Sequence, residues 1–308
     1  MPVSVILIAG PTASGKSAIA IALAQALNGV VINADSMQVY ADLRALTARP
    51  LPAEERLVPH ALFGHVDGAV NYSTGLWLDD ADRALAEARA AAGVAIVCGG
   101  TGLYFKALTQ GLSAIPTVPD AVRARIRGEA QGESAAALHA RLAALDPFTA
   151  AGLRPSDPQR ILRALEVFAA TGRPLASFQG QRAAPRIGPK AALRYFIAPE
   201  KPALHARISA RFAAMLQDGV LDEARALAAR RLDPALPVMR AHGAPHLMAY
   251  TRGEISLADA TERACVDTRR YTRRQFTFGR NQLGDFVNVA PEAAFERILA
   301  DCRTSQSG

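Results

Sequence analysis

The segment Gly10-Pro11-Thr12-Ala13-Ser14-Gly15-Lys16-Ser17 follows the pattern G-x-x-x-x-G-K-[ST]. A short apolar run, Val3–Ala9, precedes it, and Ala, Ile and Leu recur at helical spacing over Ser17–Leu27. Between a strand and a helix, such glycines let backbone N–H groups surround phosphate oxygens at a helix N-terminus, where the helix dipole favours negative charge. The lysine of the pattern neutralises the terminal phosphate, and its serine hydroxyl binds Mg²⁺. The segment therefore predicts a phosphate-binding loop (P-loop) with Mg²⁺ on Ser17, in preference to a glycine-rich turn without a ligand.

Further apolar runs predict the rest of a sheet. Val30–Ile32 and Val94–Cys98 are short and apolar, and the helical pattern Ser73–Ala92 separates them. Lys190–Ala198 and Val287–Val289 have the composition of two more strands. Strands that alternate with helices indicate a parallel sheet with helices packed on it. Because ligands of such sheets bind outside the carboxyl ends of the strands, we expect the chemistry to converge there.

The pattern changes after about residue 115. From Ala121 to Gly172 the apolar spacing is helical, with no strand. We therefore expect an α/β fold with a P-loop parallel-sheet catalytic domain at residues 1–115 and 190–308. A helical insertion domain would occupy residues 116–189.

The net charge of +7 is unevenly distributed. Residues 1–115 have a balance of −2, and residues 116–308 have a balance of +9. Of the 35 basic residues, 31 are Arg, which suits planar, bidentate contacts with phosphate. This excess indicates an acidic partner such as RNA. A GC-rich genome would also favour Arg codons, so composition alone leaves the partner open.

Cysteine usage and hydropathy predict the compartment. Cys98, Cys265 and Cys302 are odd in number and far apart, which fits neither a disulfide framework nor a zinc site. No apolar run reaches the roughly 18 residues of a membrane span, and the first ten residues lack the basic start of a signal peptide. We expect a cytoplasmic monomer with reduced thiols and no membrane partner.

The phosphate loop alone does not identify the phosphate. A nucleoside triphosphatase usually has an acidic metal-binding residue at the end of a later strand, but Val94–Cys98 runs into Gly99-Gly100-Thr101-Gly102. The acidic residue follows the second strand instead, as Asp35. An aspartate at that point could act on an acceptor group or could cap the next segment.

Two segments beside the phosphate loop carry a more specific signal. Asp35-Ser36-Met37-Gln38-Val39-Tyr40 and Gly99–Tyr104 resemble the tRNA dimethylallyltransferases, also called tRNA isopentenyltransferases. The resemblance continues in order to about Arg280, through residues 58–60, 157–166, 211–219, 237–240, 253–255 and 268–275. It implies transfer of a dimethylallyl group from dimethylallyl pyrophosphate to tRNA. The acceptor is the exocyclic amine of the adenosine adjacent to the anticodon on its 3′ side, and pyrophosphate is released.

The resemblance also implies a role for each matching residue. Asp35 would be the general base toward the amine, Thr101 would contact the reacting centre, and Arg211 would steady the departing pyrophosphate together with Mg²⁺. The pyrophosphate would bind to Gly10, Thr12, Ala13, Ser14, Gly15, Lys16 and Ser17.

A second set of residues is implied to bind tRNA, with the helical insertion gripping the anticodon arm. The matching positions are Asp35, Ser36, Met37, Gln38, Thr101, Arg123, Gln159, Arg160, Ile161, Leu162 and Arg163. A helical wheel places Gln159, Arg163 and Glu166 on one face, which is typical of a solvated surface and also suits RNA contact. Another helical face predicts a strip that follows the phosphates of tRNA, beside Tyr271. Its members are Arg269, Arg270, Arg273 and Arg274.

Three stretches depart from the family pattern. Ala45–Pro50 lacks the usual glycine, and His60–Gly64 and Gly243–His246 differ in sequence. These changes bear on the loop at residues 45–65 and on tRNA docking, but they leave the phosphate loop and Asp35 intact. Two other functions stay open: a P-loop small-molecule kinase, in which Asp35 activates a hydroxyl group, and a non-catalytic RNA-binding relative.

Overall fold

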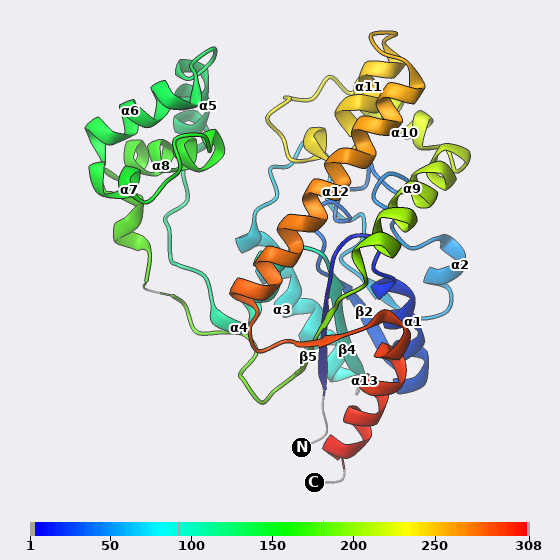
Figure 1. The fold of residues 1–308 in the computed structure, drawn as a ribbon. Coiled ribbons are helices and arrows are strands. Elements are labelled where there is room, and N and C mark those ends of the chain that lie inside the picture. Colours follow the sequence, from blue (N-terminus) through cyan, green and yellow to red (C-terminus); the bar gives the residue numbers. More distant parts are fainter. Residues whose placement is uncertain (1–3, 92, 181, 307–308) are drawn as a thin grey trace. The chain divides into compact units, whose positions relative to one another are not determined.

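The computed structural model describes residues 4–91, 93–180 and 182–306. Its sheet has six strands in the order β3-β2-β4-β1-β5-β6, and all neighbouring strands are parallel (Figure 1). The strands are β1 Val5–Ala9, β2 Gly29–Asn33, β3 His60–Ala61, β4 Val94–Gly99, β5 Leu193–Ile197 and β6 Val287–Val289. The predicted α/β class with a parallel sheet is confirmed. The chain divides into two compact units, one at residues 1–109 and 186–308 and the other at residues 110–185.

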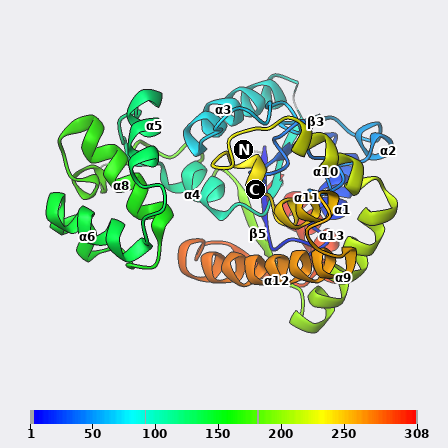
Figure 2. The same cartoon turned by 90° about the horizontal axis from the view of Figure 1, so that it is seen from above.

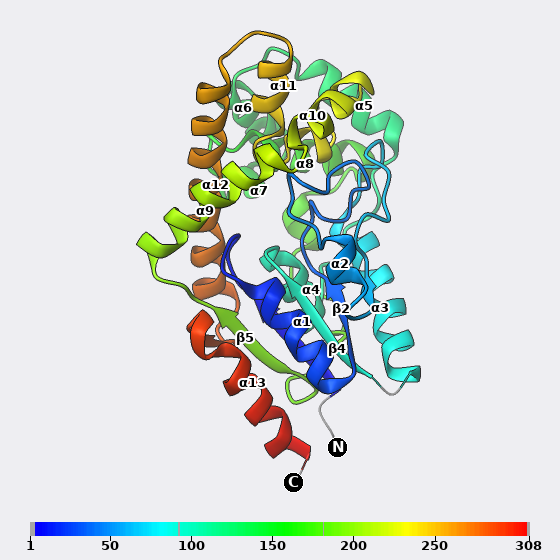
Figure 3. The same ribbon diagram turned by 90° about the vertical axis from the view of Figure 1, so that its right-hand side faces the viewer.

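The sheet of the first unit carries helices on both faces. α1 (Lys16–Leu27) and α13 (Pro291–Gln306) cover one face, where Ile6 and Ile8 of β1 join the main apolar core (Figure 3). α3 (Thr74–Ala90) packs against β2 and β4 from the other face. The buried strands read as continuous apolar runs because both of their faces are covered.

A group of helices follows β5 in this unit. They are α9 Lys201–Gln217, α10 Val220–Ala229, α11 Ala244–Thr251 and α12 Leu257–Gln282, with a short 3₁₀ turn at Val238–Arg240. α12 packs against both α9 and α11 (Figure 2). The remaining helices of the unit are α2 Pro52–Glu55 and α4 Gly102–Gln110. None of the helices in the described ranges is long and apolar enough to cross a membrane.

The second unit is helical. Its elements are α5 Asp120–Glu129, α6 Ala135–Leu145, α7 Pro147–Ala151, α8 Pro158–Thr171 and a 3₁₀ turn at Leu175–Phe178. α5 and α6 both pack on α8, and the core between them contains Leu142, Ile161 and Leu165. This core makes the unit compact by itself.

The structure corrects the helical wheel at one position. Glu166 does not share the exposed face of Gln159, because its side chain is only 3% exposed and its Oε1 accepts a hydrogen bond from Arg127 Nε at 2.8 Å. Packing of α5 on α8 brings that partner from 39 residues away, and the sequence pattern of one helix contains no such information.

Most predicted strands and helices are found within a few residues of their expected bounds, and two expected ends, Val3 and Ala92, lie outside the described residues. The sequence pattern missed β3, whose two residues, His60 and Ala61, are too few to show a period.

Candidate active site

The phosphate loop leaves β1 at Ala9 and enters α1 at Lys16. Gly15 precedes the helix with φ +88°, and Ala13 has φ +64°, so the loop uses the left-handed region twice. Gly10 lies against β5: a Cβ built on it would lie 2.9 Å from the carbonyl oxygen of Ile197. The loop therefore turns tightly over the carboxyl end of the sheet, as a phosphate cradle requires.

Two polar side chains of this loop are prepared for an anion. The hydroxyl Oγ of Ser14 is buried and has no hydrogen-bond partner among the described residues. Within the described ranges, Lys16 Nζ donates only to the carbonyl oxygen of Pro11, at 3.1 Å. Burial lowers the pKa of Lys16, and the nearby Cys98 and Asp35 oppose that shift. A buried cation without a carboxylate partner is costly, and a bound phosphate would compensate it.

Gln275 on α12 joins the phosphate loop to the end of β4. Its side-chain Oε1 accepts a hydrogen bond from the backbone N–H of Thr12 at 3.0 Å, and its Nε2 donates to Gly100 O at 2.9 Å. The residue is 6% exposed. The sequence places Gln275 in a family-like block but gives it no role, because the contact joins residues 263 positions apart.

Asp35 follows β2 at the same edge of the sheet. Its Oδ1 accepts a hydrogen bond from Met37 N at 2.9 Å, so the carboxylate does cap the following turn. Its other oxygen, Oδ2, accepts no hydrogen bond from the described residues and faces Gly100, where a built Cβ would lie 3.3 Å away. Asn33 fixes the backbone here, since its Oδ1 accepts from Asp35 N at 2.9 Å and its Nδ2 donates to Asp35 O at 3.0 Å. One oxygen of Asp35 is thus structural, and the other is available.

Thr101 stands beside this turn. Its Oγ1 accepts a hydrogen bond from Ser36 N at 2.9 Å and donates to Ser36 Oγ at 3.2 Å. Its backbone N–H donates to Ala34 O at 3.1 Å. These bonds join the exits of β2 and β4, and they bring Asp35 and Thr101 together as the sequence predicts.

A mostly apolar pocket opens above Asp35. The lining side chains come from the phosphate loop, from Asp35 and the segment after it, from α9 and α12, and from the residues before α11: Thr12, Asp35, Met37, Leu46, Thr47, Ile208, Arg211, Phe212, Met215, Ala241, His242, Thr268 and Tyr271. Burial raises the pKa of Tyr271, and the charge of Asp35 adds to that shift. Burial lowers the pKa of Arg211, and Asp35 opposes that shift. Asp35 and Arg211 are thus an anion and a cation on the wall of one pocket.

A larger cleft of about 800 Å³ adjoins this pocket and contains the phosphate loop. Arg211 and Met215 line both cavities. The cleft exposes residues 13–19 on one wall and Arg44 and Arg49 on another. An anion on the loop would therefore lie at the border of an apolar pocket that contains a carboxylate.

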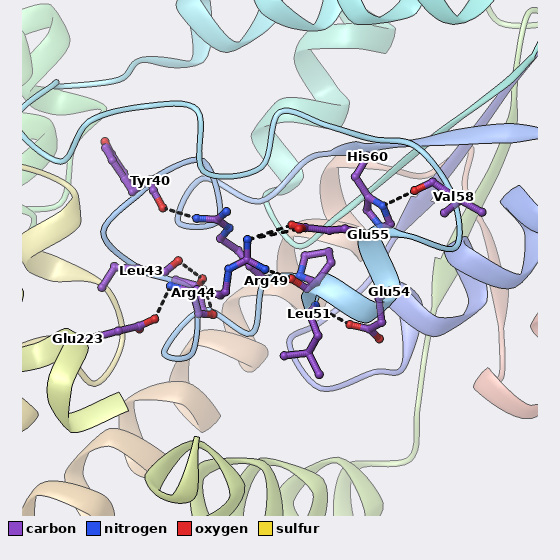
Figure 4. Close-up of polar contacts among 12 residues, drawn as sticks. Tyr40, Leu43, Arg44, Arg49, Leu51, Glu54, Glu55, Val58, His60 and Glu223 are labelled. Atoms are coloured by element: carbon purple, nitrogen blue, oxygen red, sulfur yellow. Dashed lines mark hydrogen bonds and ion pairs between the residues drawn. The ribbon is translucent and has the colours of Figure 1, made fainter. Parts of the chain in front are cut away.

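The second wall of this cleft is the segment at residues 44–50 (Figure 4). The carboxylate of Glu223, in the first turn of α10, accepts hydrogen bonds from the backbone N–H groups of Arg44, Ala45 and Leu46 at 2.8, 2.6 and 3.0 Å. Arg44 donates to Pro50 O at 2.6 Å and pairs with Glu55 at 3.2 Å. The departure from the family pattern at residues 45–50 thus lies in an ordered wall of the cleft.

The arginines predicted on α12 differ in exposure. Arg270, Arg273 and Arg274 are exposed, whereas Arg269 is partly buried and donates to Ser209 Oγ at 2.9 Å. Gln38, also predicted to bind tRNA, donates through its amide to Thr47 O at 2.9 Å and Ala48 O at 3.0 Å.

The residues predicted to bind tRNA in the helical unit also differ. Gln159 and Arg160 are exposed, and Arg123 pairs with Asp120 at 2.6 Å. Burial lowers the pKa of Arg163, which is partly exposed. Ile161 is fully buried in the unit's core, which argues against a direct contact of its side chain with RNA.

Comparison with known proteins identifies the family. A model described as IPP transferase matches residues 38–282, and one described as isopentenyl transferase matches residues 3–58. Proteins named tRNA dimethylallyltransferase are similar over nearly the whole chain. One from Beijerinckia indica subsp. indica is 59% identical over 289 residues, which are 94% of this chain and 96% of that protein. One from Methylobacterium nodulans is 59% identical over 295 residues, 96% and 97% of the two chains.

Solved structures agree with these matches. The tRNA isopentenylpyrophosphate transferase of Bacillus halodurans superposes with a TM-score of 0.68 at 27% identity, over 99% of this chain and 98% of that one. A eukaryotic dimethylallyltransferase acting on tRNA gives a TM-score of 0.76 at 26% identity, over 93% and 73% of the two chains. These matches, together with the phosphate loop and the parallel sheet, show that the chain belongs to the IPP transferase family.

Proposed function

We propose that this chain transfers a dimethylallyl group from dimethylallyl pyrophosphate to the exocyclic amine of the adenosine on the 3′ side of the anticodon in tRNA. Family membership gives the reaction class. The observation that supports the mechanism is the border between two cavities, with the phosphate loop in one and Asp35 on the wall of the other. Donor pyrophosphate and acceptor amine would meet at this border.

The donor's pyrophosphate would bind to Gly10 and to Thr12–Ser17. The unpartnered Ser14 hydroxyl and the buried Lys16 ammonium suit an anionic ligand. The dimethylallyl chain would then extend into the apolar pocket, against side chains such as Met37, Phe212 and Met215. Exclusion of water there would protect the reacting carbon from hydrolysis.

Prenyltransferases typically need a divalent metal, and we propose Mg²⁺ for this chain. In the described residues, no group of three or more His, Cys, Asp or Glu could hold an ion. The cation would therefore be held by the Ser17 hydroxyl and by pyrophosphate oxygens, the hard oxygen ligands that Mg²⁺ prefers. When bound, it would supply positive charge to the leaving pyrophosphate.

Asp35 would act as the general base. An adenine amine is a weak nucleophile because its lone pair is delocalised into the ring. As the new C–N bond forms and the C–O bond to pyrophosphate breaks, Asp35 Oδ2 would accept the amine proton while Oδ1 stays bonded to Met37 N. Thr101 would contact the acceptor next to it, and Arg211 would stabilise the charge of the departing pyrophosphate.

For tRNA, we propose that residues 116–189 grip the anticodon arm through Arg123 and the Gln159–Arg163 segment, and that the exposed α12 arginines follow the phosphate backbone. Ser36 and Met37 would contact the acceptor nucleotide from the turn after Asp35. The target base would leave the stacked anticodon loop to reach Asp35.

The proposal is tested by mass spectrometry of nucleosides from unmodified tRNA incubated with the protein, dimethylallyl pyrophosphate and Mg²⁺. A dimethylallylated adenosine beside the anticodon, with one pyrophosphate released per nucleoside, is expected. A protein that binds tRNA without turnover would be a non-catalytic relative. Consumption of ATP with a small-molecule acceptor and no prenylated nucleoside would instead support a kinase.

A further inference from the structure

The cleft around the phosphate loop is lined by five basic side chains, and these differ in how they are paired. Arg44 pairs with Glu55 at 3.2 Å, and Arg207 pairs with Glu292 at 3.4 Å. In the described part of the chain, the other three have no carboxylate partner: Lys16, Arg49 and Arg211. Two of these already have a place in the proposed function. Arg49 has none.

The guanidinium of Arg49 is under-bonded for a group of its kind. It carries five N–H donors, yet its one hydrogen bond to a described residue runs from Nη1 to Tyr40 O at a long 3.3 Å. Its Nε is buried without a partner. Burial and the neighbouring Arg44 lower the pKa of Arg49, while Glu55 and Glu223, neither of which forms an ion pair with it among the described residues, oppose that shift. A partly desolvated arginine whose guanidinium meets a single backbone acceptor has N–H donors left for an anion.

The surrounding structure holds Arg49 in this position. Gly64 has φ +58°, and a Cβ built on it would lie 2.0 Å from Arg49 Nη1, so the guanidinium rests directly against the glycine backbone. Gln38 fixes the two residues before Arg49 by donating to Thr47 O and Ala48 O. Glu223 fixes the start of the segment through three backbone N–H groups (Figure 4). Both anchors are made before any ligand binds, which reduces the entropy cost of using Arg49.

We propose that Arg49 is an anion-binding residue that contacts the donor's pyrophosphate from the second wall of the cleft, while the phosphate loop holds it from the first. Planar, bidentate N–H groups suit two oxygens of a phosphate better than an ammonium does. The identity of the donor rests on the proposed function, whereas the anion site itself does not.

The test uses inorganic pyrophosphate as the probe and needs no acceptor. Isothermal titration of the full chain in Mg²⁺ should show that Arg49→Ala weakens pyrophosphate binding at least tenfold and that Arg49→Lys gives an intermediate affinity. Arg207→Ala, in the same cleft but paired with Glu292, is the matched control and should bind as the wild type does. A wild-type dissociation constant in Arg49→Ala would overturn the proposal.

Loss of folding is separated from loss of binding by thermal unfolding without ligand. If Arg49→Ala melts well below the wild type, Arg49→Gln replaces it, because the amide can still donate to Tyr40 O while the charge is gone. This variant should also lose affinity at least tenfold, and equal affinity would overturn the proposal in the same way.

Kinetics with donor and tRNA separate this proposal from the proposed function. Arg49→Ala should raise the KM for the donor with the KM for tRNA unchanged. If the wild type transfers no prenyl group but Arg49→Ala still loses pyrophosphate affinity, the proposed function fails and the anion site stands. If the wild type prenylates tRNA and Arg49→Ala binds pyrophosphate normally, the proposed function stands and the anion site at Arg49 fails.

Discussion

The side-chain oxygen of Gln275 accepts a hydrogen bond from the backbone N–H of Thr12, in the phosphate loop, at 3.0 Å. The Nε2 of the same side chain donates a hydrogen bond to Gly100 O at 2.9 Å. One buried side chain from α12 therefore fixes the loop that would bind the donor and the strand exit that carries Thr101. Because α12 also carries the exposed arginines, Gln275 links the donor site to the helix that carries the proposed RNA strip.

Gln275→Glu should disturb the donor site with little change in shape. The carboxylate can still accept from Thr12 N but cannot donate to Gly100 O, and it adds negative charge beside the phosphate loop. We expect donor affinity to fall about tenfold or more and unfolding free energy to fall by roughly 1–3 kcal/mol, the cost of an unsatisfied buried group. Titration with pyrophosphate and urea unfolding measure the two effects. Thr277→Ala, which removes an exposed side chain from the same helix, is the control, and an equal loss there would point to α12 as a whole.

Asp35→Asn tests whether Asp35 acts as a general base in addition to capping the following turn through its Oδ1. Asparagine keeps an acceptor for Met37 N and has the same reach, but it cannot take a proton. We expect turnover to fall by about 10²–10⁴-fold, with pyrophosphate and tRNA affinities changed much less. Single-turnover prenylation and separate binding assays measure this split.

The matched control is Asp79→Asn, at an exposed carboxylate on α3 of the same unit. It should prenylate tRNA at the wild-type rate. If Asp35→Asn reacts just as fast, the transferase function would stand, but Asp35 would be only the cap that its bond to Met37 N already shows.

The features that the sequence predicts well are those encoded locally. The phosphate loop is one contiguous pattern, and β1, β2 and β4 are built on contiguous apolar runs. The convergence of Asp35 and Thr101 follows from the rule that parallel strands end at one edge. Strand order could not be read in the same way, because it depends on packing between elements distant in the chain.

Apart from β3, the features that the sequence misses depend on a distant partner. Gln275 meets Thr12 across 263 residues, and Glu166 meets Arg127 across 39. A helical wheel treats Glu166 as solvated because charged side chains usually are. Its ion pairs with Arg127 and Arg163, at 2.8 and 4.0 Å, compensate its burial. Arg49 was missed for a related reason, since the sequence does not show which acceptors reach its guanidinium in the folded cleft.

Glu166→Ala should destabilise the helical unit without changing the donor site. It removes the carboxylate that pairs with Arg127 at 2.8 Å and with Arg163 at 4.0 Å, and both arginines lose this partner. We expect a loss of roughly 1–3 kcal/mol in unfolding free energy, while pyrophosphate affinity, which belongs to the other unit, stays unchanged. Urea unfolding followed by circular dichroism measures the first quantity.

Glu133→Ala is the comparison, because Glu133 makes a more exposed pair with Arg141 at 3.5 Å. Exposed pairs contribute about 0–1 kcal/mol, so its cost should be clearly smaller. Equal costs would mean that the burial of Glu166 adds nothing to stability.

Binding of tRNA should weaken steeply with salt. Arg273 is exposed on α12 and Arg160 is exposed on α8, and each variant to Ala should reduce the log–log salt slope by roughly 0.7 to 0.9 if the residue contacts one phosphate. Filter binding at several salt concentrations gives the slopes. Arg83→Ala, at an exposed α3 arginine paired with Asp80, should leave the slope unchanged. If the affinity of the wild type for tRNA does not change with salt concentration, codon usage and not RNA binding explains the excess of arginine.

Cys98 makes the stability of the chain sensitive to alkaline pH. The thiol is buried at the end of β4, and burial raises its pKa to about 12, with Lys16 opposing and Asp35 adding to the shift. In the unfolded chain the pKa is about 8.5. Since the folded pKa is the higher one, this contribution is complete below about pH 8.5 and is lost as pH rises toward 12.

The measurable consequence is a difference between the wild type and Cys98→Ala. Tyrosine and lysine side chains of the unfolded chain also titrate near pH 10, so the total stability of either protein is not the test. From pH 8.5 to 10.5 the wild type should lose about 2–3 kcal/mol more unfolding free energy than Cys98→Ala, since each unit of pH above the unfolded pKa costs about 1.4 kcal/mol. Urea unfolding at a series of pH values gives both curves. Parallel curves, or rapid alkylation of Cys98 in the folded protein at pH 8, would show that the folded thiol ionises as readily as a free one.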